Sequence, residues 1–313
     1  MYQSIAKRCL FRTFVRTYSW LTRSLYSGAN EIKVWNWNTI LDRIANKKQL
    51  QQHSNVQVYQ LEAIKCDLQF NNNTNSETNS LAFDSNLLYS AGGDGLIHCY
   101  DLNAGKQVSQ FGGNNNNTAV SFQQHRYYLS MAIAHNTIYA GKDDGLLYMF
   151  DTKQQHFIRS FSPFLGPEYS QNKQSQRNSY ISTICIDDSK NWLLCGGGPH
   201  AYAVLYSIPS LSPAAVLPLN STLNNACFTP SGIVTVGNER FVNIWERNGT
   251  LRNRIETKME VLYGVSADKH SSIDDQYACV VTGSVSSVSY ENSGYAVKAQ
   301  AIADGSVVYD WKF

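Results

Sequence analysis

The chain has 313 residues and a formal net charge of +2, with 16% charged and 43% hydrophobic residues. This hydrophobic content is enough to fill a sizeable core. No run of 18 apolar residues occurs, so we expect no transmembrane helix and no membrane partner.

Basic residues gather at the N-terminus. Residues 1–30 contain five basic side chains and no acid, so the remaining 21 basic and 24 acidic residues leave a net charge of −3. An Arg-rich, acid-free segment is typical of a mitochondrial presequence. The alternative is an edge of the folded domain or a start inside a longer reading frame. We favour the alternative and assign residues 1–14 as a basic N-terminal segment, because residues 15–22 already resemble a strand.

A hairpin pattern recurs along the rest of the chain. In residues 87–102, LLYSAGGDGLIHCYDL, two apolar runs flank a Gly-rich turn and the second run ends near an aromatic residue. Related hairpins give the aromatic column Trp35, Tyr100, Phe150, Tyr206, Trp245 and Tyr290, with spacings of 65, 50, 56, 39 and 45 residues. A four-stranded propeller blade repeats about every 40 to 45 residues, and loops can lengthen an interval. The pattern therefore predicts an all-β fold, a β-propeller with six visible blades.

The first intervals contain insertions. Residues 38–52 place apolar side chains at helical spacing, which predicts a short helix that either packs on its own blade or docks a partner; we favour the former. Residues 56–64 alternate in polarity and predict a strand. The asparagine-rich segments 71–79 and 114–117 offer nothing to a core and predict disordered loops between blades.

The later blades follow more regularly. After an inner strand at 181–186 comes a triple glycine, Gly196-Gly197-Gly198. Neither Lys-Ser nor Lys-Thr follows it, so we expect a turn that uses positive φ rather than a phosphate-binding loop. The last blade is expected to end with an outer strand at 295–302. We thus assign the propeller to residues 15–302 and a C-terminal tail to residues 303–313.

Residues that could carry chemistry are scattered. The histidines have no metal-ligand spacing, and no Ser/His/Asp arrangement follows from the sequence, so we predict no catalytic residue, no metal site, no cofactor and no small-molecule substrate. Asp94 and Asp144 lie in the turns of two hairpins, where we predict a structural role. Asp187 and Asp188 are expected to be solvated in another turn. We expect the cysteines to be small buried thiols, because no Cys-x-x-Cys pair occurs.

Nucleic-acid binding requires a basic stripe or exposed aromatic side chains that stack on bases. Beyond its N-terminus the chain is slightly acidic, and its aromatic residues fall at strand positions expected to be buried. We therefore expect any RNA contact to be weak or indirect. The surface that binds partners is not identified by these residues.

Several segments resemble known families. Trp35, Trp245 and Tyr100-Asp101 resemble the Trp-Asp dipeptide of WD40 repeats, although the Gly-His signature of those repeats is absent. In addition, four segments resemble, in the same order, the THO complex subunit 6 family: NEIKVWNWNTILDRI (30–44), NWLLCGGGP (191–199), FVNIWERNGTL (241–251) and VVTGSVSSVSYENSGYAVKAQAI (280–302). The resemblance covers roughly residues 18–302.

This resemblance implies a nuclear, non-enzymatic, seven-bladed propeller. It also implies that the propeller binds other THO/TREX subunits, including their coiled-coil parts, and couples transcription and splicing to mRNA export. Since only six blades are visible, a first blade is expected to be missing or incomplete. Two alternatives remain: a generic WD40 adaptor such as a ubiquitin-ligase substrate receptor, and a quinone-dependent propeller enzyme, whose repeats resemble residues 91–106 and 140–154.

Overall fold

The structure, a computed structural model, divides into two compact units, Met1–Tyr128 and Leu129–Phe313, and each is considered by itself. It describes residues 15–19, 24–28, 31–36, 66–71, 76–112, 127–164, 179–230, 232–267, 279–286, 295–303 and 306–312. Four predicted features lie outside these residues: the basic segment 1–14, the helix at 38–52, the strand at 56–64 and the loop 114–117.

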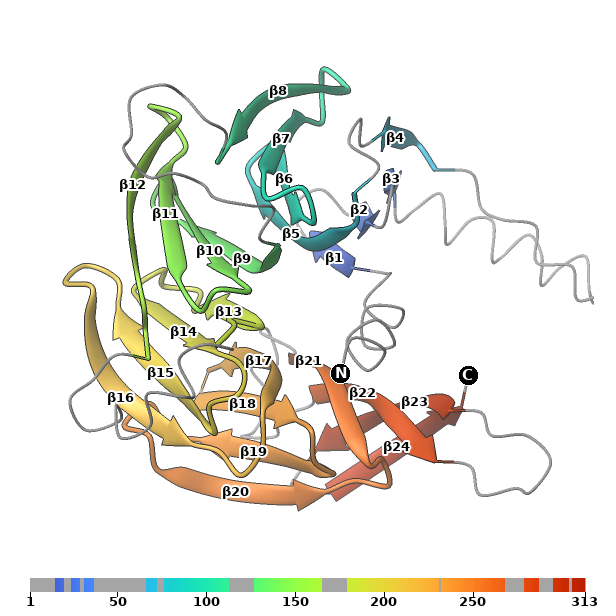
Figure 1. Cartoon of the computed structure of the whole chain (residues 1–313). Coiled ribbons are helices and arrows are strands. Elements are labelled where there is room, and N and C mark those ends of the chain that lie inside the picture. Colours follow the sequence, from blue (N-terminus) through green and yellow to red (C-terminus); the bar gives the residue numbers. More distant parts are fainter. Residues whose placement is uncertain are drawn as a thin grey trace, which may run out of the picture. The chain divides into compact units, whose positions relative to one another are not determined.

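The described residues form six antiparallel sheets, each made of four strands that follow one another in the sequence (Figure 1). The first two sheets are β1 (Val15–Ser19), β2 (Ser24–Gly28), β3 (Glu31–Asn36) and β4 (Leu68–Asn71), and β5 (Thr78–Asp84), β6 (Leu87–Gly92), β7 (Ile97–Asp101) and β8 (Lys106–Phe111). The third and fourth are β9 (Tyr128–Ala134), β10 (Thr137–Lys142), β11 (Leu147–Asp151) and β12 (His156–Phe161), and β13 (Thr183–Ile186), β14 (Trp192–Gly196), β15 (Tyr202–Ser207) and β16 (Ser212–Pro218). The fifth and sixth are β17 (Leu223–Thr229), β18 (Gly232–Gly237), β19 (Phe241–Trp245) and β20 (Leu251–Glu256), and β21 (Val261–Ala267), β22 (Cys279–Ser286), β23 (Tyr295–Ala303) and β24 (Ser306–Lys312).

Burial differs between the strands of a sheet. In the second sheet the middle strands β6 and β7 are buried at nearly every position, whereas the outer strand β8 is mostly exposed. The third sheet repeats this contrast in β10, β11 and β12. Middle strands buried on both faces are expected where sheets pack face to face against neighbours.

Apolar clusters join neighbouring sheets within each unit. In the first unit, Ile32 and Phe70 of the first sheet pack with Leu88 and Tyr100 of the second. In the second unit, separate clusters join the third sheet to the fourth, the fourth to the fifth and the fifth to the sixth. The core therefore lies between the blades, as the repeat pattern predicts.

Side-chain hydrogen bonds connect the first strands of neighbouring sheets in the second unit. The backbone N–H of Ile184 donates to Ser130 Oγ at 2.8 Å, so β13 is tied to β9. On the other side of β13, Thr183 Oγ1 donates to the carbonyl of Asn224 at 2.8 Å, and Asn224 Nδ2 donates to the carbonyl of Leu262 at 2.8 Å. The strands that open each sheet are thus linked in series from β9 to β21.

The asparagine-rich segment 71–79 is not a loop throughout, contrary to the sequence prediction. Asn71 ends β4, while Thr78 and Asn79 begin β5. Thr78 is buried, and Asn79 Nδ2 donates to the carbonyl of Tyr128 at 2.9 Å. A polar side chain can occupy such a strand because its amide finds a backbone partner. Residues 72–75 lie outside the described part.

The end of the chain also differs from the prediction. Residues 295–302 belong to β23, which is the third strand of the last sheet rather than its outer strand. The outer strand is β24, whose Val307 pairs with Ile302, so residues 303–313 include a strand and are not only a tail. Tyr290 falls between β22 and β23, outside the described residues. The sequence interpretation therefore ended the last blade one strand early.

The triple glycine lies at the turn between β14 and β15, where a turn was expected, but the reason for glycine differs. The glycines with positive φ include Gly95 and Gly145, and Gly197 is not among them. A Cβ atom on Gly197 would lie 2.0 Å from the carbonyl oxygen of Tyr180. Glycine is required there because another segment of backbone passes close by, not because of its conformational freedom.

Candidate functional site

Five of the six residues of the predicted aromatic column occupy one register position in the third strand of successive sheets. Each of them pairs with an aliphatic residue, the second residue of the second strand in its sheet. The pairs are Leu25–Trp35, Leu88–Tyr100, Ile138–Phe150, Leu193–Tyr206 and Ile233–Trp245. Four of the aromatic residues, Tyr100, Phe150, Tyr206 and Trp245, follow directly on a register shift against the outer strand. In the last sheet this position is held by Ile302, not Tyr290.

The polar atoms of Trp245 and Tyr100 have partners on the second strand of their sheets, ten residues earlier. Trp245 is buried, and its Nε1–H donates to Thr235 Oγ1 at 2.8 Å. Tyr100 shares a hydrogen bond with Ser90 at the same spacing, and burial raises the pKa of Tyr100. Phe150 has no polar atom, and the residue ten before it is Ala140. In each of these residue pairs, the buried polar groups are therefore either both present and hydrogen-bonded or both absent.

The buried hydroxyl of Tyr206 has a partner of another kind. Its hydroxyl donates at 3.2 Å to the carbonyl of Pro163, which follows the last strand of the preceding sheet. Its ring meets Phe161 edge-on with centroids 5.7 Å apart. The fourth sheet therefore uses its column residue to hold the segment that follows β12.

Asp94 and Asp144, the two predicted turn residues, make equivalent contacts. One carboxylate oxygen of each accepts the backbone N–H two residues later, Leu96 at 3.0 Å and Leu146 at 2.9 Å. The other oxygen contacts the side chain four residues later: His98 Nε2 lies 2.7 Å from Asp94, and the Tyr148 hydroxyl donates to Asp144 at 3.0 Å. Both carboxylates are directed into their own hairpin.

A third member of this set was not identified from the sequence. Glu239 stands six residues before Trp245, as Asp94 stands six before Tyr100. Asn243 Nδ2 donates to Glu239 Oε1 at 2.9 Å, again four residues away, and Arg254 of the outer strand pairs with the same carboxylate. The six-residue spacing from the acidic residue to the aromatic residue could have identified Glu239 from the sequence.

The fourth sheet carries a histidine at this position. His200 lies six residues before Tyr206, and its Nε2 is 2.9 Å from Ser179 Oγ. Its ring lies 4.3 Å from the ring of Phe164, and burial lowers the pKa of this imidazole. An imidazole ring that packs on an aromatic side chain replaces the carboxylate of the other turns.

A buried carboxylate, Asp187, was predicted to be solvated. The structure corrects this: Asp188 is exposed, but the side chain of Asp187 is only 3% exposed. Asp187 Oδ1 accepts the N–H groups of Asn191 and Trp192 at 3.0 Å, and Oδ2 accepts Ser189 Oγ at 2.6 Å. The turn between β13 and β14 closes around this carboxylate.

The guanidinium of Arg247 in the fifth sheet lies 3.4 Å from Asp187 Oδ2, and so links two sheets. Burial by itself would raise the pKa of Asp187, but the hydrogen bonds from Ser189, Trp192 and Asn191, together with Arg247, outweigh it and lower the pKa overall. The carboxylate is therefore more stable as an anion in the folded protein than in the unfolded chain.

Asp187→Asn tests this contact through its pH dependence. A folded-state pKa below the unfolded value of about 3.9 gives stability that is present above that pH and lost as pH falls through the folded pKa. At pH 7 we expect the variant to lose about 2 kcal/mol of unfolding free energy, since it replaces charge-assisted hydrogen bonds. The difference from the parent should shrink below about pH 4. Urea unfolding at several pH values measures it.

Asp188→Asn is the matched control, because it removes the same charge from an exposed neighbour. We expect its unfolding free energy to stay within about 0.5 kcal/mol of the parent at pH 7. A deficit for Asp187→Asn that is equal at pH 7 and pH 3 would contradict the assignment.

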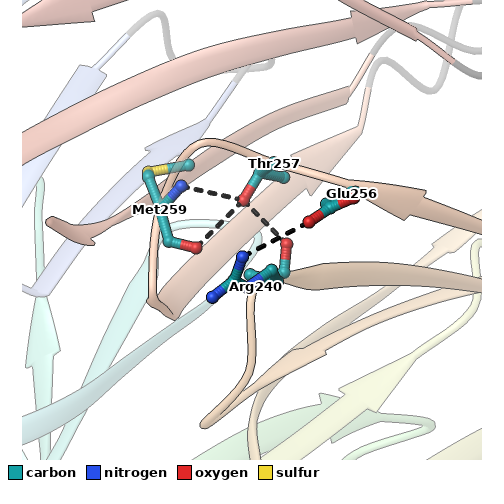
Figure 2. A network of polar contacts seen from close by, with 4 residues as sticks. All are labelled: Arg240, Glu256, Thr257 and Met259. Atoms are coloured by element: carbon teal, nitrogen blue, oxygen red, sulfur yellow. Dashed lines mark hydrogen bonds and ion pairs between the residues drawn. The ribbon is translucent and has the colours of Figure 1, made fainter.

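A further polar network ties the fifth sheet to the start of the sixth, and Figure 2 shows its members. Thr257 Oγ1 donates to the carbonyl of Arg240 at 2.8 Å and accepts the N–H of Met259 at 3.2 Å. The exposed guanidinium of Arg240 also lies 3.4 Å from Glu256 Oε1, an ion pair that contributes little. The buried threonine fixes the link between β20 and β21.

The part of the chain that the structure describes contains no group of three or more His, Cys, Asp or Glu residues arranged to hold a metal ion. The same residues include no helix long and apolar enough to cross a membrane. Of the described cysteines, Cys99 and Cys195 are buried, and burial raises the pKa of the Cys195 thiol.

Comparisons with known proteins give a consistent result. No protein-family model matches the chain. Curated relatives include THO complex subunit 6 of Arabidopsis thaliana, 24% identical over 61% of this chain, and that of Homo sapiens, 21% identical over 87% of this chain. The chain covers 72% of the human relative but only 47% of the Arabidopsis one, about half its length. THO complex subunit 6 of Drosophila melanogaster is 24% identical over 60% of this chain and 49% of its own length.

Solved structures support the fold. A chain of the crystal structure of the mitotic checkpoint complex, a WD40 propeller, matches with a TM-score of 0.61 and 11% identity, over 84% of this chain and 70% of that one. The predicted all-β, WD40-like propeller with six visible blades is confirmed. The chain is therefore similar to THO complex subunit 6 proteins of several eukaryotes, and its fold is that of a WD40-like propeller.

Proposed function

We propose that the chain is a non-enzymatic interaction scaffold of a nuclear THO/TREX-type assembly, where it couples transcription and splicing to mRNA export. Its partners are other subunits of that assembly, including coiled-coil subunits, and its contact with RNA is weak or indirect. No cofactor, metal ion or small-molecule substrate takes part.

The observation that carries this proposal is the similarity to proteins of one name from distant eukaryotes. The relatives from Arabidopsis thaliana, Homo sapiens, Danio rerio and Drosophila melanogaster are all called subunit 6 of the THO complex. Because the alignment reaches 275 residues in the human relative, it spans most of the blades rather than one repeat. A shared subunit name over so much of the chain supports a shared place in a complex.

The chemistry of the turns supports a scaffold rather than an enzyme. The carboxylates of Asp94, Asp144 and Glu239 are engaged by N–H, imidazole, hydroxyl or amide groups of their own hairpins. Groups used in this way stabilise the presented loops. The structural role predicted for Asp94 and Asp144 remains a proposal that substitution would test.

Affinity purification of the tagged chain from nuclear extract, followed by mass spectrometry, tests the function. We expect other THO subunits to be enriched over a control propeller with the same tag. Enrichment of cullins or their adaptor proteins without THO subunits would instead favour the ubiquitin-ligase alternative. Stoichiometric binding of calcium and a quinone would favour the enzyme alternative and overturn the proposal.

A further inference from the structure

Each described sheet ends in an outer strand with no further strand beside it; β8, β12, β16 and β20 are four of these edges. An edge strand presents unpaired backbone N–H and C=O groups, and proteins commonly guard it with proline or charge. The edges of the second unit are guarded to different extents. Among β12, β16 and β20, this difference identifies β12 as the edge that is open to an added strand.

The edges β16 and β20 are guarded. β16 contains Pro213 and Pro218, which cannot donate a backbone hydrogen bond. β20 carries exposed charges of both signs, and its Arg254 and Glu256 are paired with side chains of the same sheet. Prolines and paired opposite charges both disfavour the addition of another strand to these edges.

The edge β12 has neither a proline nor paired charges of opposite sign. Its sequence, HFIRSF, contains no proline and no acid. Ile158 is 41% exposed and falls at the register shift, opposite no residue of β11. The basic side chains near it are Lys153, His156 and Arg159, all exposed. Such an edge repels a second copy of itself and suits an acidic strand.

The strand is held firmly in place while its edge stays open. Phe157 packs edge-on against Phe150 with ring centroids 5.8 Å apart, and Phe161 packs against Tyr206. The guanidinium of Arg159 lies 5.4 Å from the ring of Phe161 and has no acidic partner among the described residues. A strand that is already fixed in place lowers the ordering cost of binding. The guanidinium of Arg159 offers a charge to an acidic partner.

The acid on this hairpin, Asp151, lies at the turn, where its charge acts on His156 and Lys153 and not on Arg159. Asp151 Oδ1 accepts the backbone N–H groups of Lys153 and Gln154, both at 2.8 Å, at the turn before β12. Its carboxylate is therefore occupied in closing the turn. The exposed side chains of β12 itself are basic or apolar.

We propose that β12 is a docking edge that takes an extended acidic segment of a partner protein as an additional antiparallel or parallel strand. Backbone groups of the edge pair with the segment, carboxylates face Arg159 and His156, and an aliphatic side chain covers Ile158. The bound segment alternates acidic and aliphatic residues. This inference rests on the scaffold function proposed above and names the chemistry of one partner segment.

A synthetic peptide of five Val-Glu repeats, labelled with fluorescein, tests the docking edge on the full-length chain. We expect binding by fluorescence anisotropy and slower amide hydrogen exchange in residues 156–161. Arg159→Glu should weaken binding about tenfold or more, because it reverses the charge opposite the carboxylates. Arg252→Glu on β20 makes the same charge change on a guarded edge and should leave binding unchanged.

Two further peptides separate strand addition from charge alone. Five Pro-Glu repeats carry the same charge but lack backbone donors, and five Val-Lys repeats carry the opposite charge. Equal binding of the Val-Glu and Pro-Glu peptides, or exchange protection elsewhere than in β12, would overturn the proposal. So would undiminished binding by an Arg159→Glu variant with the parent circular dichroism spectrum. If THO subunits still co-purify, such a result removes the docking edge and leaves the proposed function standing.

Discussion

Trp245→Ala is expected to lower the free energy of unfolding by about 4 kcal/mol, the cost of deleting a large buried aromatic side chain. Trp245 belongs to the cluster that joins the fourth and fifth sheets, where it packs with Leu194, Leu217 and Phe228. Its removal leaves a cavity between two blades and an unpartnered hydroxyl on Thr235. Urea unfolding followed by far-ultraviolet circular dichroism measures the loss.

Leu251→Ala provides the matched control for this variant. Leu251 is the register partner of Trp245 on the outer strand, yet 43% of it is exposed. We expect this substitution to cost no more than about 0.5 kcal/mol. A loss below about 1 kcal/mol for Trp245→Ala would show that the column is not part of the packed interface between blades.

Gly197→Ala is expected to cost about 3 kcal/mol, at the upper end of the range for overpacking. The added Cβ would lie 2.0 Å from the Tyr180 carbonyl oxygen and 2.7 Å from the backbone nitrogen of Ser182. Both atoms belong to the backbone that leads into β13, so relief requires that segment to move. Thermal and urea unfolding of the purified variant would measure the effect.

Gly93→Ala controls for the change of residue type. Its Cβ would meet the ring of Tyr127 at 3.3 Å, and that side chain is 49% exposed and able to move aside. We expect a change within about 1 kcal/mol, because alanine also restricts the unfolded chain. Equal losses for the two glycine variants would contradict the close approach at Gly197.

The sequence allowed the blades to be predicted because their signals are local. An aromatic residue that ends one strand meets an aliphatic residue of the neighbouring strand, so the hairpin alone creates the pattern seen at Tyr100, Phe150 and Trp245. In the last sheet the column position is held by Ile302, which is not aromatic. The search for an aromatic residue therefore selected Tyr290 and ended the last blade one strand early. The column position requires a side chain that packs between strands, and an aliphatic residue can fill it as well as an aromatic one.

The remaining features depend on residues far apart in the sequence. Asp187 is buried partly because Arg247, sixty residues later, lies against it. The imidazole of His200 contacts Ser179 Oγ, and the two strands of the β13–β14 hairpin separate these residues in the sequence. The docking edge at β12 emerges only from comparison with the edges beside it. None of these arrangements leaves a regular spacing in the sequence, so periodicity could not reveal them.

The pairing between Trp245 and Thr235 also constrains how such a blade can change during evolution. Loss of the hydroxyl alone would leave a buried indole N–H without an acceptor, at a cost of about 1 to 3 kcal/mol, whereas replacing both residues by apolar ones can be nearly neutral. Phe150 with Ala140 is such an apolar pair. A blade can therefore change from the hydrogen-bonded pair to the apolar pair only through a less stable intermediate or by substitution of both residues together. Blades that have made that passage at different times would keep one fold while their sequence signatures diverge.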